Sequence, residues 1–371
     1  MNDQNELGRK GDTVALQNPD AGGFEDEQVR DEFLAFLRVE ADVDSLSFTE
    51  NPVRLLGGFD TLIFAFSPDG APQELAGPLI VRVFPDMAGQ GQAKKEAVFQ
   101  NAMADAGYAA PRVLIHCGAR TIAGRAFNVM ERVSGHSPME DMMSGPEVAP
   151  RVTDQLARAH VDLHDLPSGD IAGSLRESGV SAEAFTTSGQ LRFIERYAAE
   201  PALSHLTPLV DWLVANRPEQ RDELSICHGD FHPGNIMVDG ERVSGILDWP
   251  GAVLADAEYD VAASVVLITV GGSSLAPDTP PEIFEAFAAG YLDSYSQQRT
   301  LDPERLRYYR ASRAVRAFLR RSAARTSRVA RDLAPRDQYP WTEEGAVRRL
   351  ARVISETTGI DAPLPPGVEP A

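Results

Sequence analysis

The hydrophobic positions near the start of the chain change from helical spacing to strand spacing. Between residues 24 and 43 apolar residues recur every three or four positions, which predicts an amphipathic helix. The residues that carry this spacing are Val29, Phe33, Leu34, Phe36 and Leu37. Three β-rich runs follow, over residues 53–56, 61–66 and 79–84, and turn residues close each of them. Short apolar runs between turns are typical of neighbouring antiparallel strands, so we predict a meander here.

The rest of the chain is mainly helical by its spacing. Residues 92–106 predict a helix, and residues 113–117 and 126–131 predict two more strands. After a break at Ser134-Gly135, helical spacing dominates over residues 148–165, 182–198, 202–215, 283–297 and 303–332, with strand-like pieces only at 236–238 and 244–247. A β-rich first third before a helical remainder predicts an α+β protein with two lobes.

This division sets the domain organisation that we expect. The N-lobe comprises residues 24–133 and the C-lobe residues 134–360. Residues 1–23 have no apolar period and predict a flexible tail, and residues 361–371 predict a Pro-rich tail.

Composition and charge narrow the possible functions. A chain of 371 residues with 43% hydrophobic residues is typical of a globular protein with about two domains. The formal net charge of -20 opposes binding to nucleic acid or to an anionic membrane. The N-terminus lacks the apolar core of a signal peptide, and Cys117 and Cys227 form neither a disulfide framework nor a zinc spacing. We therefore expect a soluble, cytoplasmic protein, and nothing in the sequence fixes its oligomeric state.

One segment stands apart by the spacing of its polar side chains. The stretch HGDFHPGNIMVDG, residues 228–240, places Asp230 five residues before Asn235, and Asp248 follows the next apolar run. Two apolar strands around a turn predict a β-hairpin that brings these three side chains to one end. Asn and Asp oxygens suit Mg²⁺ held together with substrate phosphates. In phosphoryl transfer a loop Asp accepts the proton of the nucleophile, while a loop Asn and a later Asp hold the metal.

Other chemistries fit the same segment less well. His228 and His232 are spaced like a helical metal pair, but Gly229, Pro233 and Gly234 oppose a helix, which weighs against zinc. The chain contains neither a G-x-S-x-G hydrolase motif nor a G-x-x-x-x-G-K-[ST] nucleotide motif.

The segments HGDFHPGNIMVDG and GILDW resemble the signature of the aminoglycoside phosphotransferase-like enzymes. These enzymes share a protein-kinase-like fold with choline, homoserine and methylthioribose kinases. The resemblance extends over roughly residues 50–320 in layout and is specific mainly between residues 226 and 260. It implies a bilobal fold with a small β-rich N-lobe and a larger, mostly helical C-lobe. It also implies that Asp230 is the catalytic base and that Asn235 and Asp248 bind Mg²⁺.

The same resemblance assigns supporting residues around the loop. Trp249 stands in the aromatic position of the kinase DFG motif, and Asp256 and Asp260 match the GDPxxD pattern of the family, whose second Asp braces the catalytic loop. We expect His228, Asp256 and Asp260 to support this loop structurally. We expect Glu258 to be a solvent-exposed acid.

The nucleotide site is expected in the first lobe. Arg82 is the only cation in the run 79–84, and Glu96 lies in the following helix. Kinases place a Lys–Glu pair there to hold phosphates, and Arg supplies both charge and a bidentate fork. The alternative is that Arg82 faces solvent. Gly57 and Gly58 occupy the place of the phosphate-covering loop, although two glycines in a hairpin are often only a turn.

The run 127–135 resembles the hinge that joins the lobes. By this resemblance the backbone C=O of Glu131 and the N–H of Val133 hydrogen-bond the nucleotide base, and Met130 lies behind the base. A Met at a strand end is usually part of the core.

The acceptor site is the least defined part. Residues 302–331 hold ten arginines against Asp302 and Glu304, and we expect them to make internal ion pairs, the alternatives being binding of nucleic acid or of an anionic acceptor. Our main hypothesis is an ATP- or GTP-dependent kinase, with Mg²⁺, for a hydroxyl group of a small molecule such as an aminoglycoside. The alternatives are a choline, homoserine or sugar kinase, or a non-catalytic nucleotide-binding scaffold. Neither nucleic acid nor membrane is an expected partner.

Overall fold

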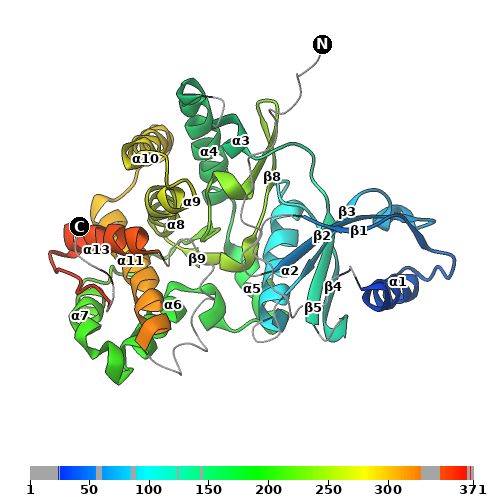
Figure 1. The fold of residues 1–371 in the computed structure, drawn as a ribbon, viewed down its shortest axis with the longest axis horizontal. Coiled ribbons are helices and arrows are strands. Elements are labelled where there is room, and N and C mark those ends of the chain that lie inside the picture. Colours follow the sequence, from blue (N-terminus) through cyan, green and yellow to red (C-terminus); the bar gives the residue numbers. More distant parts are fainter. Residues whose placement is uncertain are drawn as a thin grey trace, which may run out of the picture.

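The computed structural model describes residue 24 and residues 26–55, 61–84, 89–122, 125–142, 145–326, 343–365 and 368. Its first part is a five-stranded antiparallel sheet in the order β1-β2-β3-β5-β4, with a helix on each face (Figure 1). The elements of this part are α1 (Glu27–Ala41), β1 (Ser47–Arg54), β2 (Leu62–Asp69), β3 (Leu79–Val83), α2 (Gly89–Asp105), β4 (Val113–Ile122) and β5 (Arg125–Glu131).

Side chains alternate between the two faces of this sheet, and one helix covers each face. Phe127 of β5 packs edge-on against Phe33 of α1, with ring centres 6.0 Å apart. The next residue, Asn128, points the other way, and its Nδ2 donates to the carbonyl oxygen of Ala93 in α2 at 3.0 Å. Arg82 of β3 lies directly opposite Asn128 in the antiparallel register, so its side chain shares the α2 face.

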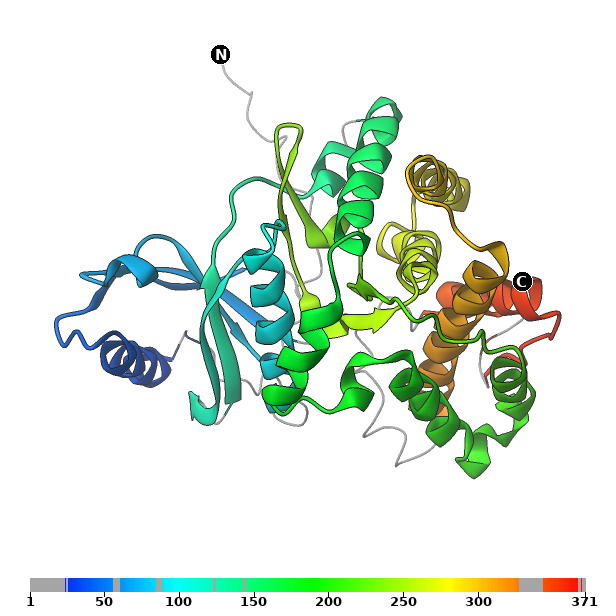
Figure 2. The same ribbon diagram turned by 180° about the vertical axis from the view of Figure 1, so that it is seen from behind.

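The remainder of the chain is mostly helical and surrounds two small antiparallel ladders, β6 with β9 and β7 with β8 (Figure 2). The strands are β6 (Ser225–Cys227), β7 (Ile236–Asp239), β8 (Arg242–Ile246) and β9 (Val253–Ala255). The helices are α3 (Pro138–Met142), α4 (Ala149–His164), α5 (Gly169–Glu177), α6 (Thr187–Ala198), α7 (Thr207–Ala215), α8 (Ala257–Val266), α9 (Ser273–Leu275), α10 (Pro281–Ser296), α11 (Pro303–Thr326) and α13 (Glu344–Thr358). A π-helix, Leu267–Gly272, continues directly from α8.

The segment after β5 ties the sheet to the β7–β8 hairpin. The backbone groups of His136 and Val238 exchange two hydrogen bonds of 3.0 and 2.9 Å. Ser244 Oγ donates to the carbonyl oxygen of Ser134 at 2.6 Å. Gly135, at a φ of 104°, lies where a side chain would overlap the carbonyl oxygen of Val238, so only glycine permits this close approach. The sheet and the hairpin are therefore held in a fixed relation.

Two hydrophobic clusters hold the helical part together. The first surrounds the β7–β8 hairpin, α4 and α10 and contains the fully buried Trp249 and Tyr291. The second joins α7, α11 and α13 and contains Phe318 and Leu350. Each large side chain buried here contributes about 2–3 kcal/mol. Val368, within the predicted Pro-rich tail, is also buried in the second cluster.

The α+β architecture expected from the sequence is confirmed, and the differences have physical causes. β1 begins at Ser47, six residues before the predicted run, because it is a bulged edge strand whose exposed side chains carry no apolar alternation. β6, β9 and α8 were not predicted, since they are buried on all sides and show no period. Within the described ranges, no helix combines the length and the apolar character needed to cross a membrane.

Candidate active site

The polar loop between β6 and β7, residues 228–235, holds Asp230 against Asn235. The loop begins where β6 ends and closes with one 3-10 turn, Pro233–Asn235. Asn235 Nδ2 donates to the backbone oxygen of Asp230 at 2.9 Å and to its carboxylate Oδ2 at 3.2 Å. Because proline and glycine prevent regular structure here, side-chain hydrogen bonds of this kind define the shape of the loop.

His228 connects the polar loop to the residue that precedes Asp248. Its Nε2 is 2.9 Å from the carbonyl oxygen of Leu247, and its Nδ1 accepts the backbone N–H of Asp230 at 3.3 Å. Burial lowers the pKa of His228, which favours the neutral ring with one donor and one acceptor. Its ring packs on Trp249 with centres 4.6 Å apart. Asp248 itself has a left-handed backbone, with a φ of 71°, a conformation that often marks functional sites.

Arg82 links the sheet to Asp248. Its Nη1 lies 3.0 Å from Glu96 Oε1, and its Nη2 lies 2.6 Å from Asp248 Oδ1. Arg82 is 7% exposed and Glu96 is 0% exposed, which excludes the alternative that Arg82 faces solvent. Burial raises the pKa of Glu96 to about 7, although the charge of Arg82 opposes this rise.

Asp260 of α8 holds the start of the polar loop by its backbone. Its Oδ1 accepts the N–H of Gly229 at 2.7 Å, and its Oδ2 accepts the N–H of His228. Burial alone would raise the pKa of Asp260, but its contacts with His160 and His164 hold that pKa well below its usual range. The carboxylate therefore remains an acceptor for both N–H groups.

Two His–Tyr pairs enclose Asp260. His160 and His164 lie one turn apart on α4, and Tyr291 and Tyr295 have the same spacing on α10. The Nδ1 atoms of the two histidines lie 2.6 and 2.7 Å from the hydroxyls of Tyr291 and Tyr295, respectively. Their Nε2 atoms lie 3.0 and 3.4 Å from Asp260 Oδ2, and the His160 contact is not aligned as a hydrogen bond. Although His160, His164 and Asp260 could form a metal triad by distance, every nitrogen already faces a protein partner.

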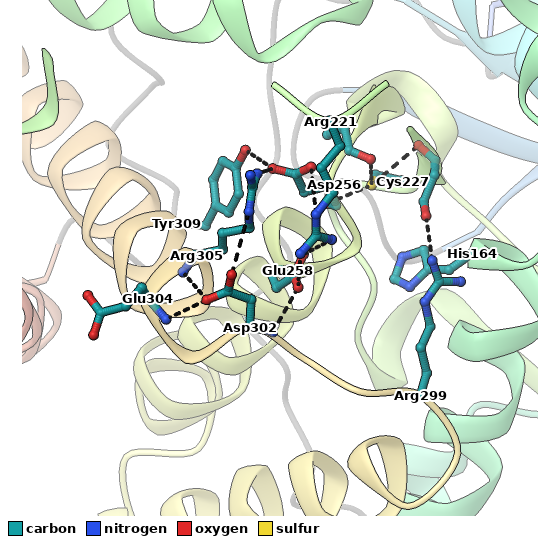
Figure 3. Close-up of polar contacts among 12 residues, drawn as sticks. His164, Arg221, Cys227, Asp256, Glu258, Arg299, Asp302, Glu304, Arg305 and Tyr309 are labelled. Atoms are coloured by element: carbon teal, nitrogen blue, oxygen red, sulfur yellow. Dashed lines mark hydrogen bonds and ion pairs between the residues drawn. The ribbon is translucent and has the colours of Figure 1, made fainter. Parts of the chain in front are cut away.

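Asp256 faces α11 rather than the polar loop (Figure 3). Its Oδ2 accepts hydrogen bonds from Arg305 Nη1 at 2.5 Å and from the Tyr309 hydroxyl at 2.7 Å. Glu258, predicted to be solvent-exposed, is 1% exposed and pairs with Arg221 at 3.1 Å. That prediction was wrong because the partner comes from a distant part of the chain, which no local pattern reveals. Both acids anchor the start of α8.

Two basic side chains face the carboxylate of Asp230. Arg313 Nη2 lies 3.4 Å from its Oδ1, and His232 Nε2 lies 3.7 Å from its Oδ2. Because His232 Nδ1 accepts the N–H of Gly234 at 3.1 Å, the proton of the neutral ring lies on Nε2, toward Asp230. Burial acts to raise the pKa of Asp230, but His232, Arg313 and His228 together bring it well below its ordinary value. Asp230 is therefore ionised at neutral pH.

A cavity of about 430 Å³ joins these groups. Of the predicted site residues, Arg82, Asp230 and Asp248 line it, while Asn235 lies behind Asp230 and Glu96 behind Arg82. The cavity wall comes from the sheet, the polar loop, the π-helix, α10 and α11. It is large enough for a small ligand.

The arginines of α11 lie in two different environments. Arg305 and Arg307, near its start, pair with acidic side chains as predicted. Further along, three arginines instead line the cavity, namely Arg313, Arg316 and Arg320. Arg305 makes the expected internal pair with Asp256, Arg307 pairs with Glu304 at the surface, and Arg313 pairs with Asp230 at the cavity. Arg328 and Arg331 lie outside the described residues.

The predicted hinge connects β5 to the hairpin. Glu131 is the last residue of β5, and its N–H donates to the carbonyl oxygen of Arg112 at 3.0 Å. The N–H of Val133 forms no hydrogen bond with any residue that the structure describes. Met130 is 7% exposed and packs in the core. The glycines predicted for the phosphate-covering loop, Gly57 and Gly58, lie outside the described residues.

The side chains beside Asp230 fit the needs of Mg²⁺. Asn235 turns its Nδ2 toward Asp230, and its Oδ1 receives no hydrogen bond from the described part of the chain. Asp248 is 35% exposed and pairs with Arg82 through Oδ1 only. An amide oxygen and a carboxylate oxygen are the hard ligands that Mg²⁺ takes in combination with phosphates.

Sequence comparison groups this chain with phosphotransferases. The model of the family described as "Phosphotransferase enzyme family" (APH) matches residues 54–309, more than half of the chain. An aminoglycoside 3'-phosphotransferase of Streptomyces fradiae is 30% identical over 206 residues, which cover 55% of this chain and 72% of that relative. Acyl-CoA dehydrogenase family member 11 of Gallus gallus is 31% identical over 174 residues, which cover 44% of this chain but only 22% of that protein. The chain thus spans less than a quarter of this longer relative.

Structure comparison agrees on the fold. A crystal structure of a thermostable mutant of aminoglycoside phosphotransferase APH(4)-Ia, in a ternary complex with AMP-PNP and hygromycin B, superposes with a TM-score of 0.55 at 16% identity. The match covers 88% of this chain and 99% of that one. The two-lobed, protein-kinase-like fold expected from the sequence is confirmed.

Proposed function

The chain belongs to the phosphotransferase enzyme family, and on that premise we propose that it transfers the γ-phosphoryl group of ATP or GTP to a hydroxyl group of a small molecule, with Asp230 as base. The observation that carries this proposal is the meeting of Asp230, Asp248 and Arg82 in one cavity, with Asn235 fixed behind Asp230. This set of two carboxylates, one amide and one buried guanidinium suits phosphoryl transfer. In that reaction the positioning of the reactants and the stabilisation of charge provide most of the catalysis.

Asp230 orients the acceptor and takes its proton. Its carboxylate is 34% exposed to the cavity and ionised at neutral pH, so it can accept the hydrogen bond of an acceptor hydroxyl. As the bond from the acceptor oxygen to the γ-phosphorus forms, the bond from that phosphorus to the bridging oxygen breaks. The proton passes to Asp230, and the nucleoside diphosphate leaves. Arg313 and His232 stabilise the ionised form before the transfer.

Asn235 and Asp248 would hold Mg²⁺. The bound ion supplies positive charge against the triphosphate. Asp248 pairs with Arg82, so this carboxylate occupies a position where positive charge is favoured. The hydrogen bonds from Asn235 Nδ2 to Asp230 leave the amide oxygen as its available ligand atom.

Arg82, held by Glu96, would bind the α- and β-phosphates of the nucleotide. Because Glu96 is fully buried, it fixes one arm of the guanidinium while the other points into the cavity.

Gly57 and Gly58 would cover the phosphates, and the backbone of Glu131 and Val133 would hold the base. The unpartnered N–H of Val133 among the described residues supports this last assignment. The similar APH(4)-Ia complex contains a nucleotide analogue, which supports a nucleotide donor for this chain.

The test is a thermal-shift titration of the purified protein with ATP and GTP, with and without Mg²⁺, followed by nucleotide consumption over a panel of hydroxyl acceptors. We expect stabilisation that needs Mg²⁺, and turnover that needs both nucleotide and acceptor. Phosphorus NMR of the product should show a phosphate monoester. Stabilisation without turnover on any acceptor would favour the nucleotide-binding scaffold instead.

A further inference from the structure

Two carboxylate–guanidinium pairs face the cavity. Asp248 pairs with Arg82, which comes from the sheet. Asp230 pairs with Arg313, which comes from α11. All four side chains line the same cavity. The proposed function assigns the first pair to the metal and the nucleotide and Asp230 to the base, but it gives Arg313 no part in the transfer step itself.

The contact between Arg313 and Asp230 leaves room for a further partner. Arg313 Nη2 donates to Asp230 Oδ1 at 3.4 Å, which is longer than usual for such a bond. The second carboxylate oxygen, Oδ2, already accepts a hydrogen bond from Asn235 at 3.2 Å. A guanidinium carries five N–H donors in a planar fork, and this contact engages one of its nitrogens. Arg313 can therefore bind an oxygen of a ligand without leaving Asp230.

The position of Arg313 is set by α8, the helix that also holds the polar loop. Near the start of α11, Arg305 and Tyr309 bind Asp256, the residue that precedes α8 (Figure 3). Further along α8, Asp260 accepts the two N–H groups that begin the polar loop. Because α8 supports both the loop and α11, the guanidinium and the base are fixed relative to each other before a substrate binds. Electrostatic catalysis needs donors that are held in place in this way.

The charges beside Arg313 change during the proposed transfer. The acceptor oxygen forms its bond to the γ-phosphorus, the bond from phosphorus to the bridging oxygen breaks with its electron pair, and the acceptor proton passes to Asp230. That proton neutralises the carboxylate, so its attraction for the guanidinium falls. Negative charge meanwhile spreads over the oxygens of the transferred phosphoryl group, which lies at the acceptor oxygen beside Asp230. This group is then the strongest anionic partner for Arg313.

We infer that Arg313 is a catalytic residue, whose guanidinium binds an oxygen of the γ-phosphoryl group while that group passes to the acceptor hydroxyl. This inference rests on the proposed function and adds a residue to the same site. Donors aimed at the place where charge develops stabilise the transition state more than the bound substrate. Arg82 reaches the cavity from the sheet and Arg313 reaches it from α11, so positive charge would face the triphosphate from both lobes.

The first test separates transition-state binding from substrate binding. Arg313→Gln keeps a hydrogen-bonding side chain but removes the charge. We expect kcat for the acceptor that the panel identifies, or for slow transfer to water, to fall by about a hundredfold. KM for ATP should stay within about threefold of the wild type, because the guanidinium contributes little to ground-state binding. The matched control is Arg307→Gln, on the same helix but paired with Glu304 at the surface, which should change neither constant.

Aluminium fluoride tests the same contact without an acceptor. With Mg²⁺ and the nucleoside diphosphate it mimics the planar phosphoryl group, and the wild-type protein should bind this combination about a hundredfold more tightly than the diphosphate alone. We expect Arg313→Gln to lose about tenfold or more of this gain in calorimetry of the full chain. Its affinity for Mg²⁺-AMP-PNP should stay within about threefold of the wild type.

Chemical rescue distinguishes this role from a structural one. In Arg313→Ala, guanidinium chloride far below the concentrations that unfold the protein should raise kcat by about tenfold, since the free ion can occupy the space of the missing side chain. Sodium chloride at equal ionic strength is the control. Arg313→Lys, which keeps the charge, should retain more activity than Arg313→Gln. A variant whose helix had only shifted would show neither effect.

The outcomes also separate this inference from the proposed function. If Arg313→Gln keeps the full fluoride gain and an unchanged kcat, the inference is overturned and the proposed function stands. A rise in KM for the acceptor alone would overturn the inference too, because Arg313 would then bind the acceptor rather than the phosphoryl group. A wild-type protein that neither binds nucleotide nor turns over any acceptor would contradict the proposed function, and the inference would fall with it.

Discussion

Arg82 Nη2 lies 2.6 Å from Asp248 Oδ1, so a buried residue of the sheet directly contacts the residue that follows the β7–β8 hairpin. The same guanidinium also contacts Glu96, and both contacts need the planar fork of arginine. This pairing provides a direct contact between the proposed nucleotide and metal sites.

Arg82→Lys should weaken nucleotide binding. The lysine side chain is shorter and ends in a single ammonium group. It cannot contact Glu96 and the nucleotide phosphates at the same time, as the two terminal nitrogens of arginine can. We expect the affinity for Mg²⁺-AMP-PNP, measured by calorimetry, to fall by about tenfold or more. The control Arg112→Lys changes an exposed pair with Asp105 and should have no measurable effect on this affinity. Equal affinities for both variants would argue against a phosphate-binding role of Arg82.

Gly229→Ala should destabilise the protein more than Gly240→Ala. Both glycines have positive φ, at 79° and 61°, so alanine costs about 1 kcal/mol at either position. At Gly229 the added carbon would also overlap the carbonyl oxygen of Gly251, whereas nothing lies within 4 Å at Gly240. We expect a total loss of about 3 kcal/mol for Gly229→Ala in urea unfolding. Similar losses for both variants would show that the loop has room at Gly229.

Tyr291→Phe should destabilise the protein through His160. The tyrosine hydroxyl is 2.6 Å from His160 Nδ1, and its removal leaves a buried nitrogen without a partner, at a cost of about 1–2 kcal/mol. Tyr308→Phe is the matched control, because Tyr308 is also buried but its hydroxyl has no hydrogen bond within the described residues. Urea unfolding measures both. A loss for the control as large as for Tyr291→Phe would contradict this role.

His164 should make stability fall in acid. Burial lowers the pKa of His164 to about 3 in the folded chain, against a usual value of 6.5. Between these pH values the unfolded chain binds a proton that the folded chain does not, so unfolding becomes easier as the pH falls. His164→Gln removes this titration. The variant should be less stable than the wild type near neutral pH, and the gap should shrink by up to about 1.4 kcal/mol per pH unit below 6.5.

Urea unfolding at about pH 5 and about pH 7.5 measures this gap. The exposed His205 gives the control, since His205→Gln should leave the gap to the wild type almost unchanged between the two conditions. A gap for His164→Gln that is equal at both pH values would contradict the assignment.

The sequence predicted the placement of the polar loop residues better than their surroundings. Asp230 and Asn235 directly precede the β7–β8 hairpin and Asp248 follows it, so the local pattern was enough to place all three at one end of this hairpin. The enclosure of Asp260 depends on helices α4 and α10, far apart in the chain. The only local signs of this enclosure were the one-turn spacings His160–His164 and Tyr291–Tyr295. Any buried helix can show such a spacing, so it does not indicate a partner.

The arginine-rich helix shows the same limit. Its composition indicated ion pairing, and Arg305 and Arg307 do pair with acids. Which of the later arginines reach the cavity depends on how α6 and α8 pack against α11. That packing follows from tertiary contacts, so no periodicity along α11 distinguishes the two environments.

The most direct test of the account is phosphoryl transfer by Asp230→Asn. Asn keeps the size of the side chain but cannot take the proton of the acceptor, so kcat should fall by about a thousandfold. The affinity for Mg²⁺-AMP-PNP should remain within about threefold of the wild type, and the control Asp239→Asn, in the exposed hairpin turn, should keep full activity. Turnover by Asp230→Asn at the wild-type rate would contradict the assignment of Asp230 as the base.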